Sequence, residues 1–170
     1  MRNLFLFLFF SFSLFGFENK RCSLKEPVVL AVLEAESHPK KELGYQYLIS
    51  FNNKEEARLV KKYLPKYFID SRTMDCENIE TCALLTKKLF ESGFYNLDLG
   101  AFQINSYHHK YPIEDYFNYE KSYKTACGYL EKMIGKYGYN WFAIASYNSQ
   151  SVLNNVKYQH KLIDNYFEKR

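Results

Sequence analysis

The most apolar run in the body of the chain lies at residues 28–33 (VVLAVL), directly after Pro27. A helix that is apolar on every side is typical of one buried by its neighbours. Ser23 and Glu26 have the spacing of a capping box, and proline is tolerated in a first helical turn. His38 precedes a proline, which disfavours helical backbone there. We therefore expect a buried helix that begins near the capping box and ends near His38.

We expect helices in five later segments as well. Apolar residues recur there at helical spacing, and Pro65, Gly93 and Gly138 supply stop signals after three of the segments. The segments are residues 54–63, 78–91, 118–138, 140–148 and 151–167. The expected apolar stripe of the last segment consists of Val152, Val156, Leu162, Ile163 and Tyr166.

Two segments lack a clear helical period. Residues 39–53 contain the alternation YQYLISF, which indicates a loop or a short hairpin strand. For residues 94–112 we expect a turn followed by a short helix. No internal repeat, low-complexity tract or linker divides the 170 residues, which are enough to bury a sizeable core. The pattern therefore predicts a mainly α fold in a single domain.

The first residues have the layout of a secretory signal peptide. Arg2 precedes an apolar stretch at residues 4–17, after which the chain turns polar. The stretch is shorter than the roughly 20 apolar residues of a membrane-spanning helix, so an uncleaved membrane anchor is the second interpretation. We therefore predict a signal peptide at residues 1–16, a mature domain at residues 17–170, and export to the periplasm.

Export changes the interpretation of the four cysteines, because thiols in an oxidising compartment tend to pair. Cys76 and Cys82 are close enough in sequence to close a short local loop, which leaves Cys22 for Cys127. We favour this pairing among the three that are possible. A zinc site is the competing interpretation, but the close CxxC pairs typical of zinc ligands are absent from the sequence.

Composition adds little about partners. The 23 basic and 19 acidic residues make the chain mildly positive, which is weak evidence for a polyanionic partner, and export further disfavours nucleic acid. The 16 tyrosines suit the edge of a core or the wall of a wet groove. Four histidines, His38, His108, His109 and His160, show no ligand-like spacing with a carboxylate. We expect neither a metal nor a cofactor.

Two acidic residues, Glu34 and Glu36, end the buried helix. At about 100° per residue, Glu36 lies on the side of Val29 and Val32, whereas Glu34 points to nearly the opposite side. A buried carboxyl group stays protonated or finds a partner. Periodicity alone does not choose between the two, because both sides of the helix are apolar.

Three short motifs resemble the signatures of the lytic transglycosylases related to goose-type lysozyme. They are Glu36-Ser37, the segment 100–105 (GAFQIN) and the segment 145–149 (ASYNS), in the family's order, and the resemblance spans about residues 24–150. It implies a goose-type, lysozyme-like helical domain with a groove. The chain departs from the family in an insertion of about 60 residues between the first two motifs, in Ala-Phe where Leu-Met is usual, and in Ser149. The small peptidoglycan-cleaving enzymes that accompany type IV secretion systems are the most similar group.

The resemblance implies that Glu36 is the catalytic acid of a peptidoglycan lytic transglycosylase. Such an enzyme cleaves the β-1,4 bond between N-acetylmuramic acid and N-acetylglucosamine and leaves a 1,6-anhydro product. Tyr147 would hydrogen-bond Glu36 or the acetamido group, and Ser37 would hold the loop after the catalytic helix. The residues implied to contact substrate are Ser37, Gln103, Asn105, Tyr147 and Asn148.

Three alternatives stay open. A hydrolase of the same bond is the first, because goose-type lysozymes share the helix-end glutamate and the outcome depends on whether water or the 6-hydroxyl group reaches the anomeric carbon first. Ordinary glycosidases add a second carboxylate, for which Asp98 is the candidate, although the resemblance implies that none is needed. A catalytically idle domain would bind glycan strands or secretion-system components as an assembly factor. A structural periplasmic domain with chance motifs is the third. The partners we expect are peptidoglycan strands and secretion-system components, with membrane contact only through an uncleaved signal segment.

Overall fold

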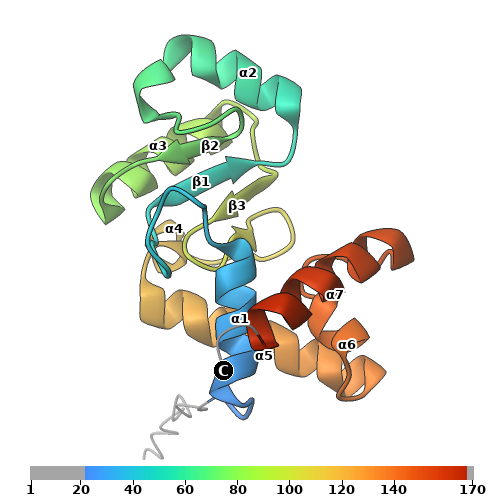
Figure 1. Cartoon of the computed structure of the whole chain (residues 1–170). Helices are drawn as coiled ribbons and strands as arrows, with labels where there is room; N and C mark the ends of the chain where they lie inside the picture. Colours follow the sequence, from blue (N-terminus) through green and yellow to red (C-terminus); the bar gives the residue numbers. More distant parts are fainter. Residues whose placement is uncertain (1–21, 168–170) are drawn as a thin grey trace, which may run out of the picture.

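The computed structural model describes residues 22–167, so the predicted signal peptide lies outside the described residues. The described chain is mainly helical, as predicted, with one small sheet (Figure 1). Its helices are α1 Glu26–Glu36, α2 Lys54–Tyr63, a 3₁₀ turn Pro65–Tyr67, α3 Ile79–Glu91, α4 Ile113–Tyr116, α5 Tyr119–Tyr137, α6 Trp141–Ala145 and α7 Val152–Phe167. Its strands are β1 Leu48–Phe51, β2 Thr73–Asp75, β3 Leu97–Leu99 and β4 Ile104–Asn105.

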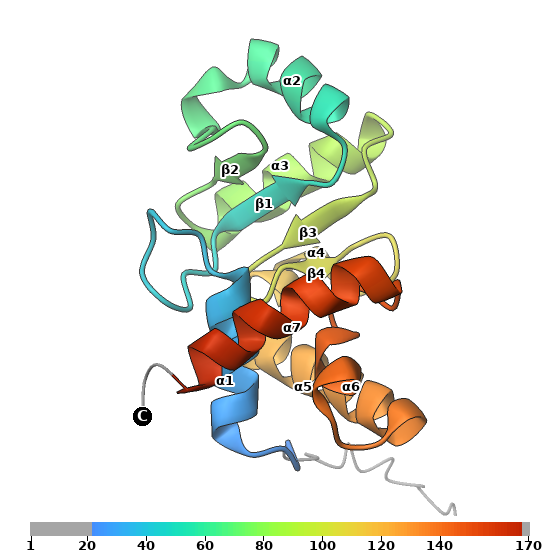
Figure 2. The same cartoon turned by 45° about the vertical axis from the view of Figure 1, so that its right-hand side comes forward.

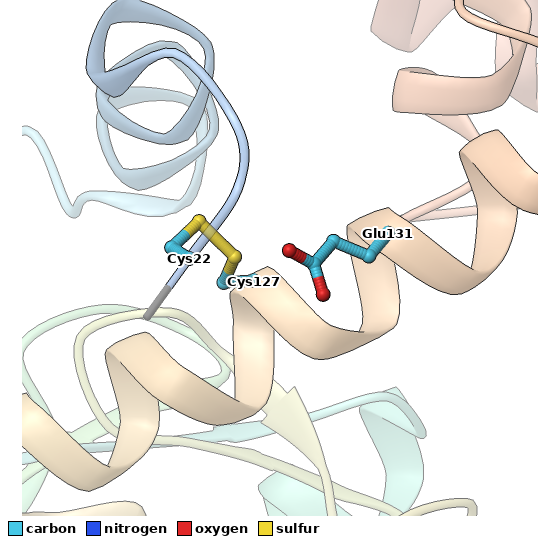
Figure 3. A group of neighbouring side chains, drawn as sticks. All are labelled: Cys22, Cys127 and Glu131. Carbon is cyan, nitrogen blue, oxygen red and sulfur yellow. A yellow bond between two sulfur atoms is a disulfide. The ribbon is translucent and has the colours of Figure 1, made fainter. Parts of the chain in front are cut away.

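The predicted capping box at the start of α1 is wrong. Lys25 is the N-cap residue and makes no side-chain cap hydrogen bond. Ser23 instead donates its backbone N–H and its hydroxyl to Glu131 Oε1 on α5, at 2.8 and 2.6 Å. The neighbouring disulfide between Cys22 and Cys127 holds this segment against α5 (Figure 3). A long-range partner therefore replaces the local one.

Asparagine caps explain why four helices begin where they do. The side chain of the residue before each helix accepts a hydrogen bond from a backbone N–H of the first turn. These residues are Asn53 before α2, Asn78 before α3, Asn118 before α5 and Asn140 before α6. The helices predicted at 54–63, 78–91 and 118–138 are confirmed to within one residue at each end.

Helix α7 confirms the predicted apolar stripe only in part: Leu162 is buried and Ile163 and Tyr166 are half-buried, but the first half of the helix buries other residues. Its buried residues are Asn155, Tyr158 and Leu162, whereas the side chains of Val152 and Val156 are 72% and 44% exposed. Helix α7 crosses α1 (Figure 2), and Asn165 Nδ2 donates to the Ala31 carbonyl of α1 at 3.2 Å. Asn155 and Tyr158 are buried because their polar groups form hydrogen bonds in the interior. The pattern of apolar residues does not include them, so it did not predict this buried face.

The four strands form an antiparallel sheet in the order β2-β1-β3-β4. The short strand allowed for in residues 39–53 is β1, but β3 and β4 occupy residues for which we expected a turn and a short helix. Gly100 makes the β3–β4 turn possible: its φ is +77°, and a Cβ there would lie 1.9 Å from the Tyr116 carbonyl oxygen. Strands β3 and β4 are too short to be predicted from their own sequence, and tertiary packing stabilises the hairpin that they form.

One row of polar residues crosses the sheet. Ser50 pairs with Thr73 on one side and with Asp98 on the other, and Asp98 pairs with Asn105. Side chains on one cross-strand row point to the same face of a sheet. This face is therefore polar, while helix α3 lies behind the sheet in both views (Figures 1 and 2).

Both favoured disulfides are present. Cys22 bonds Cys127 with a Cα–Cα distance of 5.8 Å, and Cys76 bonds Cys82 with a Cα–Cα distance of 5.1 Å. The first joins the segment before α1 to α5, and the second closes the short loop at the start of α3. Among residues 22–167, no helix is long and apolar enough to cross a membrane.

Candidate active site

Glu36 is the last residue of α1, and α7 supplies its hydrogen-bond partner. The Tyr158 hydroxyl donates to Glu36 Oε1, and Lys161 Nζ donates to the adjacent Ala35 carbonyl. Burial raises the Glu36 pKa to about 7, against the lowering effect of the Tyr158 hydrogen bond; the negative charge of Asp98 adds to the rise. Glu36 is therefore divided between its protonated and ionised forms near neutral pH.

Two hollows meet at Glu36 and form one groove. The smaller, of about 400 Å³, extends along β1 and the turn before β2, and the larger, of about 680 Å³, extends toward α5 and α6. Glu34 lines neither hollow. Five residues line both hollows: Glu36, Asn52, Asp98, Gln103 and Asn148. The structure thus brings together one residue or more from each of the three motifs.

Asp98 is a second carboxyl group in this groove. Asn105 Nδ2 donates to Asp98 Oδ1 at 2.8 Å, and Asn52 hydrogen-bonds the same carboxyl group. Burial raises the Asp98 pKa above its ordinary value, although both amides and the charges of Arg72 and His108 act in the opposite direction. Asn105 therefore contacts the second acid, a role that the motif alone does not indicate.

Gln103 and Ser37 hold backbone around the groove. Gln103 Nε2 donates to the Gly100 carbonyl at 2.8 Å and so closes the β3–β4 turn from inside. Ser37 Oγ donates to the Leu33 carbonyl at 2.7 Å, which ties the residue after α1 to the last helical turn. Both side chains line the smaller hollow, and Gln103 lines the larger one too.

One of the two roles expected for Tyr147 was a hydrogen bond to Glu36, and the structure does not contain this bond. The Tyr147 hydroxyl donates to the Phe102 carbonyl at 2.8 Å, and burial, with the charge of Glu36, raises its pKa well above the ordinary value. Tyr158 makes the bond to Glu36 instead. Sequence reasoning missed Tyr158, although its spacing from Asn155 and Leu162 places all three on one helical face.

Asn155 joins the third motif to the helix that carries Tyr158. Its side chain is fully buried, and Nδ2 donates to the Phe142 carbonyl, Ser146 Oγ and the Ser149 carbonyl at 3.1, 3.2 and 2.8 Å. The exposed side chain of Asn148 follows Tyr147 in that motif and lines both hollows. One buried amide thus fixes the motif relative to α7.

The histidines do not form a metal site in the described part of the chain. His38 Nε2 lies 3.0 Å from Asp70 Oδ2 in the wall of the smaller hollow, whereas His108 and His109 line the larger one. In residues 22–167, one group of potential ligand atoms gathers within 4.8 Å: Cys22, Cys127 and Glu131 (Figure 3). Its two sulfurs are joined in a disulfide, so neither is a thiolate ligand.

The family model of the transglycosylase SLT domain matches residues 13–167, a range that contains α1 to α7 and all three motifs. No curated protein matches the chain, and no solved structure does.

Proposed function

Because the chain belongs to the transglycosylase SLT domain family, whose lysozyme-like members are lytic transglycosylases of cell-wall peptidoglycan, we propose that Glu36 cleaves a glycosidic bond in this groove. The observation that carries the proposal is a carboxyl group with a pKa of about 7 where two hollows meet. A general acid works best when its pKa lies near the working pH. A glycan strand laid along the groove would place a sugar in each hollow and the bond between them at Glu36.

The proposed reaction uses Glu36 twice. The protonated carboxyl group donates its proton to the oxygen that leaves the anomeric carbon of N-acetylmuramic acid, and the C–O bond breaks. The carbonyl oxygen of the sugar's own acetamido group supports the positive charge that develops at that carbon. The Glu36 carboxylate then takes the proton of the 6-hydroxyl group, whose oxygen bonds to the anomeric carbon and closes the 1,6-anhydro ring.

The other groove residues are proposed to position substrate. Gln103 and Asn148 line both hollows, so each is placed to orient the sugars on either side of the scissile bond. Tyr147 lines the larger hollow and Ser37 the smaller one. Asn105 acts next to Asp98, to which it donates a hydrogen bond.

The decisive experiment is digestion of purified peptidoglycan by the mature protein and by Glu36→Gln, with mass analysis of the soluble fragments. We expect anhydro-ended fragments from the parent and none from Glu36→Gln. Glu34→Gln is the matched control and is expected to keep activity. Loss of activity in Glu34→Gln with retention in Glu36→Gln would refute the assignment of the acid.

Hydrolysis of the same bond is the second candidate, and Asp98 favours it. A second carboxylate in the groove with Glu36 is the arrangement with which a glycosidase stabilises the charged sugar or forms a covalent intermediate. Fragments that carry an added water, together with loss of activity in Asp98→Asn, would establish the hydrolase. Anhydro ends that persist in Asp98→Asn would support the transglycosylase.

We also propose that the protein is exported and opens the wall locally for a secretion apparatus. Its cell-wall-acting domain and its two disulfides support export. The secretion role is supported by the resemblance of the sequence to enzymes that accompany type IV secretion systems. In a host that lacks the protein, we expect secretion to fall and to recover with the parent but not with Glu36→Gln. Recovery with Glu36→Gln would favour an idle assembly factor.

A further inference from the structure

The smaller hollow contains a cation that the proposed chemistry does not use. Arg72 lies in the turn before β2 and lines this hollow together with Glu36 and Asp98. Burial raises the pKa of both carboxyl groups, and the positive charge of Arg72 acts against that shift in each. The guanidinium therefore lies within electrostatic reach of the place where the two hollows meet.

The backbone of Arg72 is held firmly. Its N–H donates to Asp70 Oδ1 at 2.7 Å, and its carbonyl accepts from the Phe51 N–H at 2.9 Å. Asp70 is itself fixed, because His38 hydrogen-bonds its other carboxylate oxygen at 3.0 Å and Lys61 Nζ donates to its carbonyl at 2.8 Å. The turn thus presents Arg72 from a rigid position on the groove wall.

The side chain of Arg72 has no comparable fixation. It is exposed, and no hydrogen bond or ion pair to any of residues 22–167 engages its guanidinium. Lys161, a second cation of the same hollow, is already occupied by the Ala35 carbonyl. The Asp70 carboxylate already accepts hydrogen bonds from the backbone N–H groups of residues 72 and 73 and contacts His38, so it does not pair with the guanidinium of Arg72. A guanidinium presents a planar pair of N–H donors that matches a carboxylate.

We propose that Arg72 binds a carboxylate on the lactyl-peptide arm of the muramyl sugar and makes substrate affinity depend on that arm. The inference rests on the proposed function. Peptidoglycan offers this chemistry from two sources: carboxylates of the peptide stem, and the lactyl carboxylate that is exposed on the sugar once the stem is removed. The sugar ring itself carries no charge, so an arginine in the groove selects for the arm.

The test compares Arg72→Gln with the parent on three substrates. They are stem-bearing glycan strands, strands stripped of stems by an amidase, and stem-bearing strands whose carboxyl groups have been converted to amides. We expect KM to rise about tenfold for Arg72→Gln on a carboxylate-bearing substrate with kcat within about twofold, and no difference from the parent on the amidated strands. Arg58→Gln is the matched control, because Arg58 lies on the exposed surface of α2 and pairs with Glu55.

Each outcome has a defined meaning. A KM rise on stem-bearing strands alone identifies a stem carboxylate as the ligand, and a rise on stripped strands identifies the lactyl carboxylate. An equal rise on amidated strands, or no rise on any substrate, would overturn the inference. Arg72→Lys, which keeps the charge but not the planar fork, is expected to give an intermediate KM, and thermal denaturation checks that each variant is folded.

Binding separates this inference from the proposed function. In the Glu36→Gln background, we titrate with stem-bearing strands and with amidase-stripped strands. The Kd is expected to be about tenfold weaker on at least one of the two when Arg72→Gln is added. A parent that binds strands in this Arg72-dependent way but releases no fragments would leave the inference standing and refute the function. A parent that cleaves strands while Arg72→Gln binds both kinds of strand as tightly as the parent would do the reverse.

Discussion

At the scale of the residue, the Glu36 carboxyl group is subject to opposing influences. Burial raises its pKa to about 7, and the hydrogen bond from Tyr158 limits the rise. Tyr158 is therefore a positioning residue that also tunes the proposed acid. The sequence led to Glu36 through its motif but not to Tyr158, which is 122 residues away and contacts Glu36 only because α7 crosses α1.

Tyr158→Phe tests this tuning. The change removes a hydrogen bond that favours the ionised carboxylate, so the Glu36 pKa should rise by about one unit. Because the protonated form acts as the acid, the basic limb of the kcat–pH profile is expected to move to higher pH by the same amount. Tyr147→Phe is the control, since its hydroxyl bonds Phe102, and its basic limb should stay in place. A downward shift in Tyr158→Phe would contradict the assignment.

The raised Glu36 pKa also predicts a dependence of stability on pH. The folded chain holds this proton up to a pKa of about 7, whereas the ordinary pKa of a glutamate in an unfolded chain is 4.5. Unfolding therefore releases the proton between these two pH values, and the free energy of unfolding falls as pH rises. Glu36→Gln removes the effect. The unfolding free energy of Glu36→Gln relative to the parent should therefore increase by about 3 kcal/mol from pH 4 to pH 8, measured by urea denaturation. Glu55→Gln, a substitution on the exposed surface, should show the same dependence of unfolding free energy on pH as the parent.

At the scale of the element, the helices were predictable and most of the sheet was not. Helical spacing and the residues that flank α2, α3 and α5 are local signals, and those helices begin and end within one residue of expectation. Strand β3 spans Leu97–Leu99 and β4 only Ile104–Asn105, too short to show a period. Their pairing with each other and with β1 is tertiary, and their cleft-facing residues Asp98 and Asn105 are polar because they line the groove.

Gly100→Ala tests whether the β3–β4 turn depends on glycine. The φ of +77° disfavours a side chain, and the new Cβ would meet the Tyr116 carbonyl oxygen at 1.9 Å, so we expect a loss of about 3 kcal/mol or more of unfolding free energy. Gly135→Ala is the matched control in α5: nothing lies within 4 Å of its Cβ, and alanine favours the helix by up to about 1 kcal/mol. Equal stability of the two variants would show that the turn relaxes.

At the scale of the whole molecule, the groove forms where the sheet and its flanking helices meet the bundle of α1, α5, α6 and α7 (Figure 2). Glu36 comes from the bundle and Asp98 from the sheet, so the site exists only when both parts are packed. The helical periods of the sequence predicted the mainly α class. They did not predict how the sheet packs against the helical bundle, because that packing depends on contacts between residues far apart in the sequence. The long-range disulfide Cys22–Cys127 was nevertheless predictable, because pairing the neighbouring Cys76 and Cys82 leaves these two cysteines for each other.

The two disulfides should therefore differ in their effect on stability. A cross-link removes more entropy from the unfolded chain when the loop that it closes is longer, and the sequence separations here are 105 and 6 residues. Replacing both Cys22 and Cys127 by serine should lower the free energy of unfolding by about 4–5 kcal/mol, against about 2 kcal/mol for the same change at Cys76 and Cys82. Urea denaturation of the two double variants and the parent measures the difference. A larger loss from the short loop would mean that the bond acts through packing at the start of α3, beside the sheet, rather than through the unfolded chain.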